Sequence, residues 1–164
     1  MNVQIRQLFI SPGHNFFGRH GQAAGEHATV EVAGIVCRAG RGVEGDRFLD
    51  YKPDYPGQIT FFSWEVVAAA RRKFSRPELS AGAFRRNVVV EGLDLPALIG
   101  RRFSLGGVDF AGVVESKPCY WMEQAVGPGA EAWLRGNGGL RARILRDGPL
   151  AVGPAELGLA EAAP

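Results

Sequence analysis

Short segments of alternating apolar and polar residues, separated by glycine-rich turns, recur along most of the chain. This two-residue period is that of a half-buried β-strand. The clearest unit is a hairpin in which Gly106-Gly107 joins the runs 103–105 and 108–114, because paired glycines accept the positive φ angles of a two-residue turn. The pattern therefore predicts a mainly β fold.

Further strands are expected on both sides of this hairpin. The first, residues 3–10, alternates with a shift of parity near its middle. In the next, Val30, Val32 and Val36 are expected to share one face, with Gly34 as a bend or bulge. The remaining expected strands are residues 58–62, 87–91, 140–145 and 150–152, and the last of these is expected to return as the partner of 140–145 across an Asp147-Gly148 turn.

One segment has the 3.6-residue period of an amphipathic helix. Apolar residues recur at helical spacing from Val66 to Phe74, Ser63 precedes them as an N-cap, and Pro77 closes the segment. One or two shorter helices are expected within 124–135. Short strands at regular intervals with one good helix favour a β-barrel of mostly antiparallel strands with a few short helices.

The length of 164 residues suits one domain with a sizeable core and is short for two. The sequence has neither an internal repeat nor a domain linker. We expect a single domain over residues 1–153 and a flexible tail over residues 154–164. The end of the chain is rich in alanine, and Pro154 cannot donate a ladder hydrogen bond, so the sheet is expected to stop there.

Charge and cysteine content exclude several classes of partner. The formal net charge of +2 is too small, and the basic residues too dispersed, to argue for nucleic acid. The alternating start of the sequence is not that expected of a signal peptide, and its apolar runs are shorter than a membrane span. The 2 cysteines are too few for a disulfide scaffold, which favours reduced thiols and a cytoplasmic location.

One cysteine stands in a context that suits chemistry. Lys117-Pro118-Cys119 follows a predicted strand, so the thiol is expected where the strand gives way to a loop. Pro118 ends the strand and stiffens the segment, while Lys117 brings a positive charge that favours the reactive thiolate. The alternative is a buried thiol that packs as a small hydrophobe beside two aromatic residues. Cys37 lacks the Pro-Cys context and is interpreted as structural.

Three motifs follow one another along the chain: Gly42-Val43-Glu44-Gly45-Asp46-Arg47, then Arg85-Arg86-Asn87-Val88-Val89-Val90-Glu91-Gly92-Leu93-Asp94-Leu95, then Pro118-Cys119. Together they resemble the MOSC domain, which is found at the carboxyl end of molybdenum cofactor sulfurases and in small stand-alone bacterial proteins. Each piece alone is unspecific, whereas this order and spacing are hard to obtain by chance. The resemblance runs from about Ile10 to Val152.

The resemblance implies a β-barrel whose cysteine carries sulfur or coordinates molybdenum at a site for the pterin form of the molybdenum cofactor. The family's cysteine falls on Cys119, which would then be both the catalytic residue and the metal ligand. The resemblance also implies, for some stand-alone relatives, reduction of N-hydroxylated compounds, and, at family level, an association with pyridoxal phosphate. The sequence has no recognisable flavin, iron–sulfur or aminotransferase-like segment, so another protein would have to donate electrons or sulfur.

A pterin phosphate is an anion, so its site needs backbone N–H groups near glycine and at least one guanidinium. Gly42, Gly45 and Arg47 are expected to supply these groups. Asp46 is expected to orient Arg47 or to cap the turn rather than to touch an anionic ligand. The alternative is that Gly45-Asp46 is an ordinary left-handed turn without a ligand.

The second motif adds further candidates. Arg85 is expected to form a second anion clamp and Asn87 to read an edge of the pterin, with Arg47, Asn87 and Cys119 around one pocket. The family often has an acidic residue where this chain has Arg86, and the departure makes the expected site more basic. The role of this position is left open.

Two loop histidines complete the set of candidates. His14 and His20 would line the mouth of the Cys119 site as proton donors or as hydrogen-bond partners of the cofactor. The alternative is that both are exposed loop residues without a role. Their spacing is not that of a helical zinc pair, and two cysteines cannot complete a thiolate site, so a structural zinc is not expected.

Functions from different classes remain open. One is a thiol enzyme or sulfur carrier in which Cys119 forms a persulfide or binds molybdenum. Another is a module that stores or delivers the cofactor without turnover and uses Cys119 only as an anchor. A third is a barrel whose pocket has lost all activity.

Overall fold

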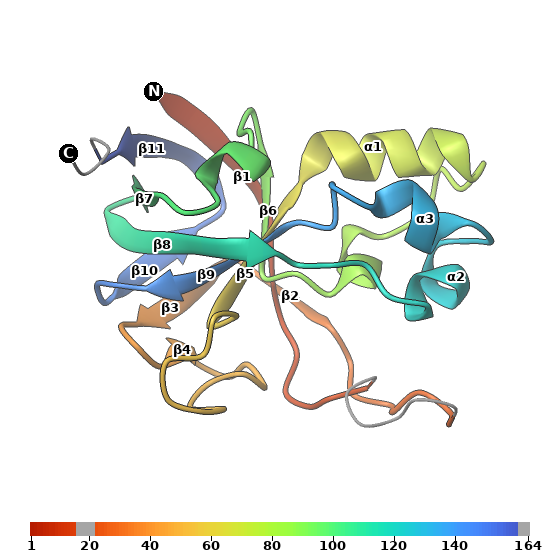
Figure 1. Ribbon diagram of the computed structural model, residues 1–164, viewed down its shortest axis with the longest axis horizontal. Coiled ribbons are helices and arrows are strands. Elements are labelled where there is room, and N and C mark those ends of the chain that lie inside the picture. Colours follow the sequence, from red (N-terminus) through yellow and green to blue (C-terminus); the bar gives the residue numbers. More distant parts are fainter. Residues whose placement is uncertain (16–21, 161–164) are drawn as a thin grey trace.

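The computed structural model describes residues 1–15 and 22–160. Seven strands form the barrel: β1 (Asn2–Ile10), β5 (Ile59–Ser63), β6 (Val88–Glu91), β7 (Arg102–Leu105), β8 (Val108–Glu115), β9 (Leu140–Ile144) and β11 (Gly153–Leu159). Their order is β11-β7-β8-β9-β5-β6-β1, and pairing of β1 with β11 closes the ring (Figure 1). Only β5 and β6 run parallel among the described strands of the ring. The predicted mainly β, mostly antiparallel barrel is therefore confirmed.

The two faces of β5 and β6 serve different cores. Phe61 and Val88 point into the barrel, whereas their neighbours Phe62 and Val89 pack against the helices. Side chains of successive strand residues point to opposite faces, and a strand covered on both sides is apolar throughout. This explains the three consecutive valines of the second motif. The expected shift of parity in β1 is also present, as a bulge between Ile5 and Gln7 opposite β6.

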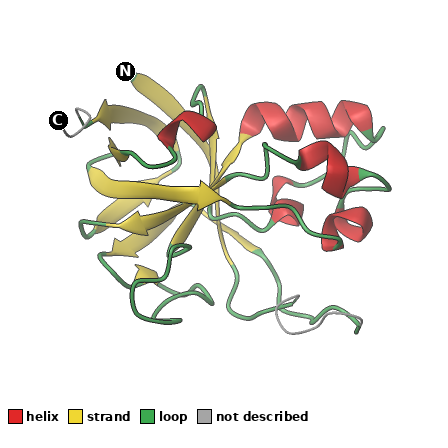
Figure 2. Ribbon diagram, in the orientation of Figure 1, coloured by secondary structure: helices red, strands yellow, loops and turns green. Residues whose placement is uncertain are grey.

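The helices gather beyond one end of the barrel, as Figure 2 shows. They are α1 (Trp64–Lys73), α2 (Trp121–Ala125), α3 (Ala130–Leu134) and the 3₁₀ turns η1 (Ala81–Phe84) and η2 (Pro96–Leu98), of which η2 lies apart from the rest on the barrel side. Ser63 caps α1 as expected, because its hydroxyl accepts a hydrogen bond from Val66 N at 3.3 Å. No helix in the described part of the chain is long and apolar enough to span a bilayer.

A small second sheet shows that two predictions were wrong, namely the partner of residues 150–152 and the shared face of Val30, Val32 and Val36. Its strands are β3 (Gly34–Arg38), β4 (Gly42–Val43) and β10 (Gly148–Ala151), so β10 pairs with β3 and not with β9. The pairing sets buried Leu150 opposite buried Ile35, and this burial favours the second sheet over a hairpin. The short strand β2 (Val30–Val32) instead pairs with β1.

Because β2 and β3 belong to different sheets, Val30, Val32 and Val36 do not share one strand face. The buried residues of β3 are Ile35 and Cys37, on the opposite side from Val36. The expected bend at Gly34 is where the chain leaves the first sheet for the second.

The expectation of a flexible tail from residue 154 is wrong up to residue 159. Residues 153–159 form β11, which pairs with both β1 and β7 and buries Ala155 and Leu157. Pro154 does not stop the sheet, because at this position β11 is paired with β1 alone, and so the missing N–H costs at most one ladder bond. Burial of the two alternate apolar residues outweighs that loss.

Candidate functional site

Cys119 is exposed and lies in the loop that joins β8 to α2, where the barrel meets the helices (Figure 1). The thiol belongs to the wall of a cavity of about 430 Å³. Other walls come from the loop after β1, the turn after β4, the end of η1, the start of α2 and strand β9. The cavity is lined by His14, Asn15, Arg47, Phe48, Phe84, Arg85, Arg86, Ser116, Lys117, Cys119, Tyr120, Trp121, Met122 and Arg141.

The placement of Cys119 follows from the local sequence. The last ladder contact of the segment is Ser116 N to Gly139 O at 2.8 Å, after which Pro118 has no N–H to donate. The chain then turns into α2, whose first hydrogen bond runs from Met122 N to Cys119 O at 2.9 Å. The thiol is therefore fixed between the end of a strand and the start of a helix, as predicted, and the alternative of a buried packing thiol is wrong.

The charged side chains that line the cavity are mostly cationic. Four arginines and Lys117 line it, and none of the described lining residues is aspartate or glutamate. Burial, with the nearby charge of Arg47, lowers the pKa of Arg85 to about 10. Burial and the charge of Arg141 lower the pKa of Arg86 to about 10. Like charges held together in a partly buried space create a strong positive potential, and so the cavity attracts an anion.

Asp46 serves the turn that presents Arg47. The Asp46 side chain is buried and accepts hydrogen bonds from Ser11 N at 2.9 Å and Phe48 N at 3.3 Å. It also accepts a hydrogen bond from Arg47 Nη1 at 3.4 Å. The expectation that Asp46 caps the turn and orients Arg47 agrees with these contacts.

Gly45 does not line the cavity but shapes the same turn. Its φ of +80° lies in the left-handed region, which glycine adopts without the strain that a Cβ brings. The structure thus gives Gly45 and Asp46 roles in holding Arg47, and only Arg47 of this motif reaches the cavity.

Arg85 reaches the cavity from the end of η1. Its backbone is left-handed, with φ of 55°, which is uncommon for a residue with a side chain and marks a constrained position. The guanidinium donates hydrogen bonds to Thr29 Oγ1 at 2.9 Å and to Gly13 O at 3.2 Å. Phe84, which precedes Arg85, stacks on Phe62 with 4.4 Å between ring centroids. Core packing therefore fixes the backbone from which Arg85 extends.

The sequence left the role of Arg86 open, and the structure assigns it one. Its half-buried side chain donates three hydrogen bonds, all to backbone carbonyl oxygens. The acceptors are Phe84 O at 2.7 Å, Gly138 O at 3.0 Å and Ser116 O at 3.0 Å. These carbonyls belong to the end of η1, the loop before β9 and the loop after β8, so Arg86 fastens the Cys119 loop to its neighbours.

The structure does not bring Asn87 to the cavity. The Asn87 side chain is buried, its Oδ1 accepts hydrogen bonds from Thr60 N and Thr60 Oγ1, and its Nδ2 donates to Phe9 O at 3.2 Å. The amide thus ties three strand segments together. A buried amide that is hydrogen-bonded within the fold and lies outside the cavity wall is not placed to read a pterin edge.

His14 lies at the cavity wall beside an aromatic cluster. Its ring contacts those of Phe48 and Tyr51, with centroid distances of 5.0 Å and 5.8 Å. Burial, followed by the charge of Arg47, lowers the pKa of His14, so the ring is mainly neutral at pH 7. His20, the other candidate, lies outside the described residues.

Two features of the cavity escaped sequence analysis. Arg141 alternates with Ala142 in β9 like any surface residue of a strand, and nothing in its local sequence marks it. Phe48 lies directly after the first motif, and Arg47 stacks over its ring at 4.7 Å from the centroid. The adjacent position of Phe48 in the sequence could have indicated this contact, because a guanidinium group stacks on the face of an aromatic ring.

The other thiol, that of Cys37, lies in the hydrophobic core. Cys37 is fully buried in the barrel core, opposite Val43 and Gly148. Burial, with a smaller effect from Asp147, raises the pKa of the Cys37 thiol to about 12. A thiol in this state is inert at neutral pH.

Protein side chains alone do not form a metal site in the described part of the chain. Among these residues, no three His, Cys, Asp or Glu side chains are grouped so that they could hold an ion. A metal at Cys119 would therefore bring most of its ligands with it, as a metal held by an organic cofactor does.

Comparisons with known proteins agree with this architecture. A family model described as the MOSC domain matches residues 52–155, a range that includes Arg85, Asn87 and Cys119 but not Arg47. The structure of the YuaD protein from Bacillus subtilis is similar, with 18% identity, 98% of each chain covered and a TM-score of 0.74. No curated protein matches the chain in sequence.

Two structures of YiiM are also similar. YiiM from Geobacillus stearothermophilus has 19% identity and a TM-score of 0.69, with 97% of this chain and 75% of that chain covered. YiiM from Escherichia coli has 17% identity and a TM-score of 0.68, with 99% and 71% covered. At these identities the likeness concerns the fold.

Proposed function

The chain belongs to the MOSC domain family, and on that premise we propose that the Cys119 cavity binds the pterin form of the molybdenum cofactor. One observation carries the proposal: the exposed thiol shares a cavity with four arginines and Lys117, and none of the described lining residues is a carboxylate. An anionic guest would neutralise this charge and offer its metal or sulfur to the thiol.

The residues of the cavity fit such a guest. Arg47 and Arg85 would hold the phosphate, since guanidinium groups bind phosphate through paired hydrogen bonds. Phe48 offers apolar surface to a flat ring system. The volume of about 430 Å³ lies in the range of small-molecule sites.

When bound, the cofactor would supply two-electron or sulfur-transfer chemistry at the metal. The protein would contribute the Cys119 thiolate as ligand or sulfur carrier, and Arg86 would keep its loop in place. His14, mainly neutral at pH 7, would accept or return a proton at the mouth of the cavity. Reduction of N-hydroxylated compounds is the turnover we propose, with electrons from a separate donor protein. A cytoplasmic location suits the reduced thiols that this chemistry needs.

A second function, delivery of the cofactor without turnover, is favoured by the exposure of Cys119. A thiol that is accessible from solvent can pass its guest to a partner protein. The two functions share the binding step and differ only in whether a substrate is converted.

The proposal is tested by elemental analysis of protein made in a host that produces the cofactor. Wild type, Cys119→Ser and the control Cys37→Ser would be analysed for molybdenum and for released pterin. We expect equal amounts of both in wild type and in Cys37→Ser, and loss of molybdenum in Cys119→Ser. Molybdenum retained in Cys119→Ser would remove the thiol from the ligand set, and pterin in none of the proteins would contradict cofactor binding.

A further inference from the structure

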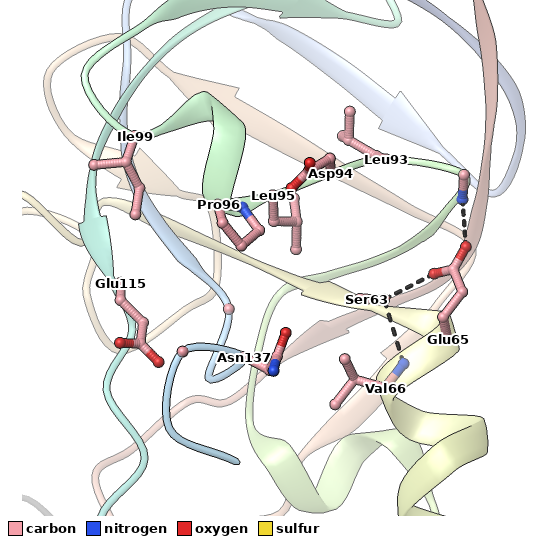
Figure 3. A pocket seen from close by; sticks show the side chains of 13 residues that line it. Ser63, Glu65, Val66, Leu93, Asp94, Leu95, Pro96, Ile99, Glu115 and Asn137 are labelled. Atoms are coloured by element: carbon pink, nitrogen blue, oxygen red, sulfur yellow. Dashed lines mark hydrogen bonds between the residues drawn. The ribbon is translucent and has the colours of Figure 1, made fainter.

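A second cavity, of about 450 Å³, adjoins the same loop and shares no lining residue with the Cys119 cavity. Glu115 lines the second cavity, whereas the next residue, Ser116, lines the first. The walls of the second cavity come from the N-terminal turn of α1, the segment 92–99, the end of β8 and the loop before β9 (Figure 3). It is a separate space on the other side of the Cys119 loop.

Much of this second cavity is apolar. Figure 3 shows Leu95, Pro96 and Ile99 along one side and Val66 facing them from the start of α1. Ile99 is 42% exposed, so part of this apolar wall faces solvent. An apolar guest would cover this surface and remove it from water.

The charged residues that line the second cavity are acidic. Three carboxylates line it, from Glu65, Asp94 and Glu115, and no Lys, Arg or His is among the described residues of its wall. Each carboxylate accepts a backbone N–H hydrogen bond, and these groups belong to Gly92, Ala97 and Gly138 respectively. Asp94 and Glu115 each use one oxygen in this way, which leaves each carboxylate a second oxygen.

The local hydrogen bonds keep Glu65 ionised. Burial by itself raises the pKa of this carboxyl group, but the hydrogen bonds from Gly92 N–H and the Ser63 hydroxyl outweigh it. The pKa therefore lies below its ordinary value, and the group is negatively charged at neutral pH.

We propose that this second cavity is a binding site for a small organic cation, an ammonium or amidinium group carried on an apolar body. The negative potential of the three carboxylates selects a cation over an anion. The apolar wall selects an organic body over a bare ion, and the carboxylates are not grouped as a metal site among the described residues. The site goes beyond the proposed cofactor function and does not depend on it.

Phenethylamine is a suitable probe, because it combines an ammonium group with an aromatic body. The test is a titration of ¹⁵N-labelled protein with this amine, followed by NMR of the amides of Gly92, Asn137 and Gly138. We expect saturable shifts centred on these amides. The matched probes are 3-phenylpropionate, which has a like body with a negative charge, and methylammonium, which has the charge without the body.

The double variant Asp94→Asn, Glu115→Gln removes two charges and keeps the acceptor oxygens that bind Ala97 N and Gly138 N. We expect phenethylamine to bind it about fivefold more weakly, as befits two partly exposed charge contacts. Glu78→Gln, which removes a carboxylate outside this wall, should bind the amine as wild type does. No saturable shifts with phenethylamine, equal shifts with either matched probe, or unchanged affinity in the double variant would overturn the proposal.

Discussion

The guanidinium of Arg86 donates a hydrogen bond of 3.0 Å to the carbonyl oxygen of Ser116, three residues before Cys119. Two further hydrogen bonds join the same guanidinium to Phe84 O and Gly138 O. A single half-buried cation therefore holds the end of η1, the loop after β8 and the loop before β9. This side chain therefore contributes to the position of the loop that carries Cys119.

Arg86→Met should destabilise the protein strongly, because it leaves three partly buried carbonyl groups without this donor. We expect the free energy of unfolding to fall by about 3 kcal/mol. Arg86→Lys, which restores one or two donors, should recover part of the loss. Urea denaturation followed by fluorescence measures both. The exposed residue Arg72 provides the control, since Arg72→Met should change stability by less than about 0.5 kcal/mol. A loss for Arg86→Met no larger than that of this control would contradict the role of Arg86.

Asn87 offers a way to separate a structural role from ligand recognition. Asn87→Ala removes the hydrogen bonds to Thr60 and Phe9, and we expect it to cost about 2 kcal/mol of unfolding free energy. Anion affinity of the folded protein should be unchanged, because Asn87 is not in the wall of the Cys119 cavity. Calorimetric titration with pyrophosphate would show this, and a large loss of affinity with unchanged stability would instead favour the reading of a pterin edge.

Stability should fall at alkaline pH because of Cys37. The folded-state pKa of this thiol is raised from 9.0 to about 12, so between these values the unfolded chain releases a proton that the folded protein keeps. Stability from this group is complete below pH 9 and is lost as the pH rises toward 12, by up to about 1.4 kcal/mol per pH unit. Denaturation of wild type and Cys37→Ala at several pH values should give a shallower decline for the variant. Parallel declines would contradict a perturbed Cys37.

The barrel was predictable because its signals are local. Alternation with Gly106-Gly107 between the runs gives a hairpin, and Val88-Val89-Val90 gives a buried strand. The partner of β10 was not predictable, because Leu150 meets Ile35 only after the chain has folded across more than 100 residues. Likewise, the local sequence marks Pro154 as a strand breaker. It is tolerated in β11 because β7 does not pair with this position, which leaves β1 as its partner.

The candidate site shows the same division. Cys119 and Arg47 were found through motifs that place a thiol after a strand and an arginine after a glycine turn. Arg141 carries no such signal, because it reaches the cavity through strand order alone. The motif that contains Asn87 led to the prediction that this residue contacts the ligand. Its hydrogen bonds instead join strand segments, so a residue of the motif can have a structural role.

The proposed function requires that the cavity shared by Cys119 and the arginines binds an anion. Iodoacetamide is neutral and small, and mass spectrometry of the native protein measures its rate of reaction at each cysteine. We expect Cys119 to be alkylated and Cys37 to be spared, and we expect pyrophosphate to slow alkylation of Cys119.

The matched variants lie two residues apart on β9. Arg141→Gln removes a cavity charge, whereas Arg143→Gln removes a charge outside the cavity wall that pairs with Asp54. Pyrophosphate should protect Cys119 about tenfold less effectively in Arg141→Gln, a difference of roughly 1.4 kcal/mol, and as in wild type in Arg143→Gln. Alkylation of Cys119 at the same rate with and without pyrophosphate in wild type, or labelling of Cys37 while Cys119 stays unmodified, would contradict the account.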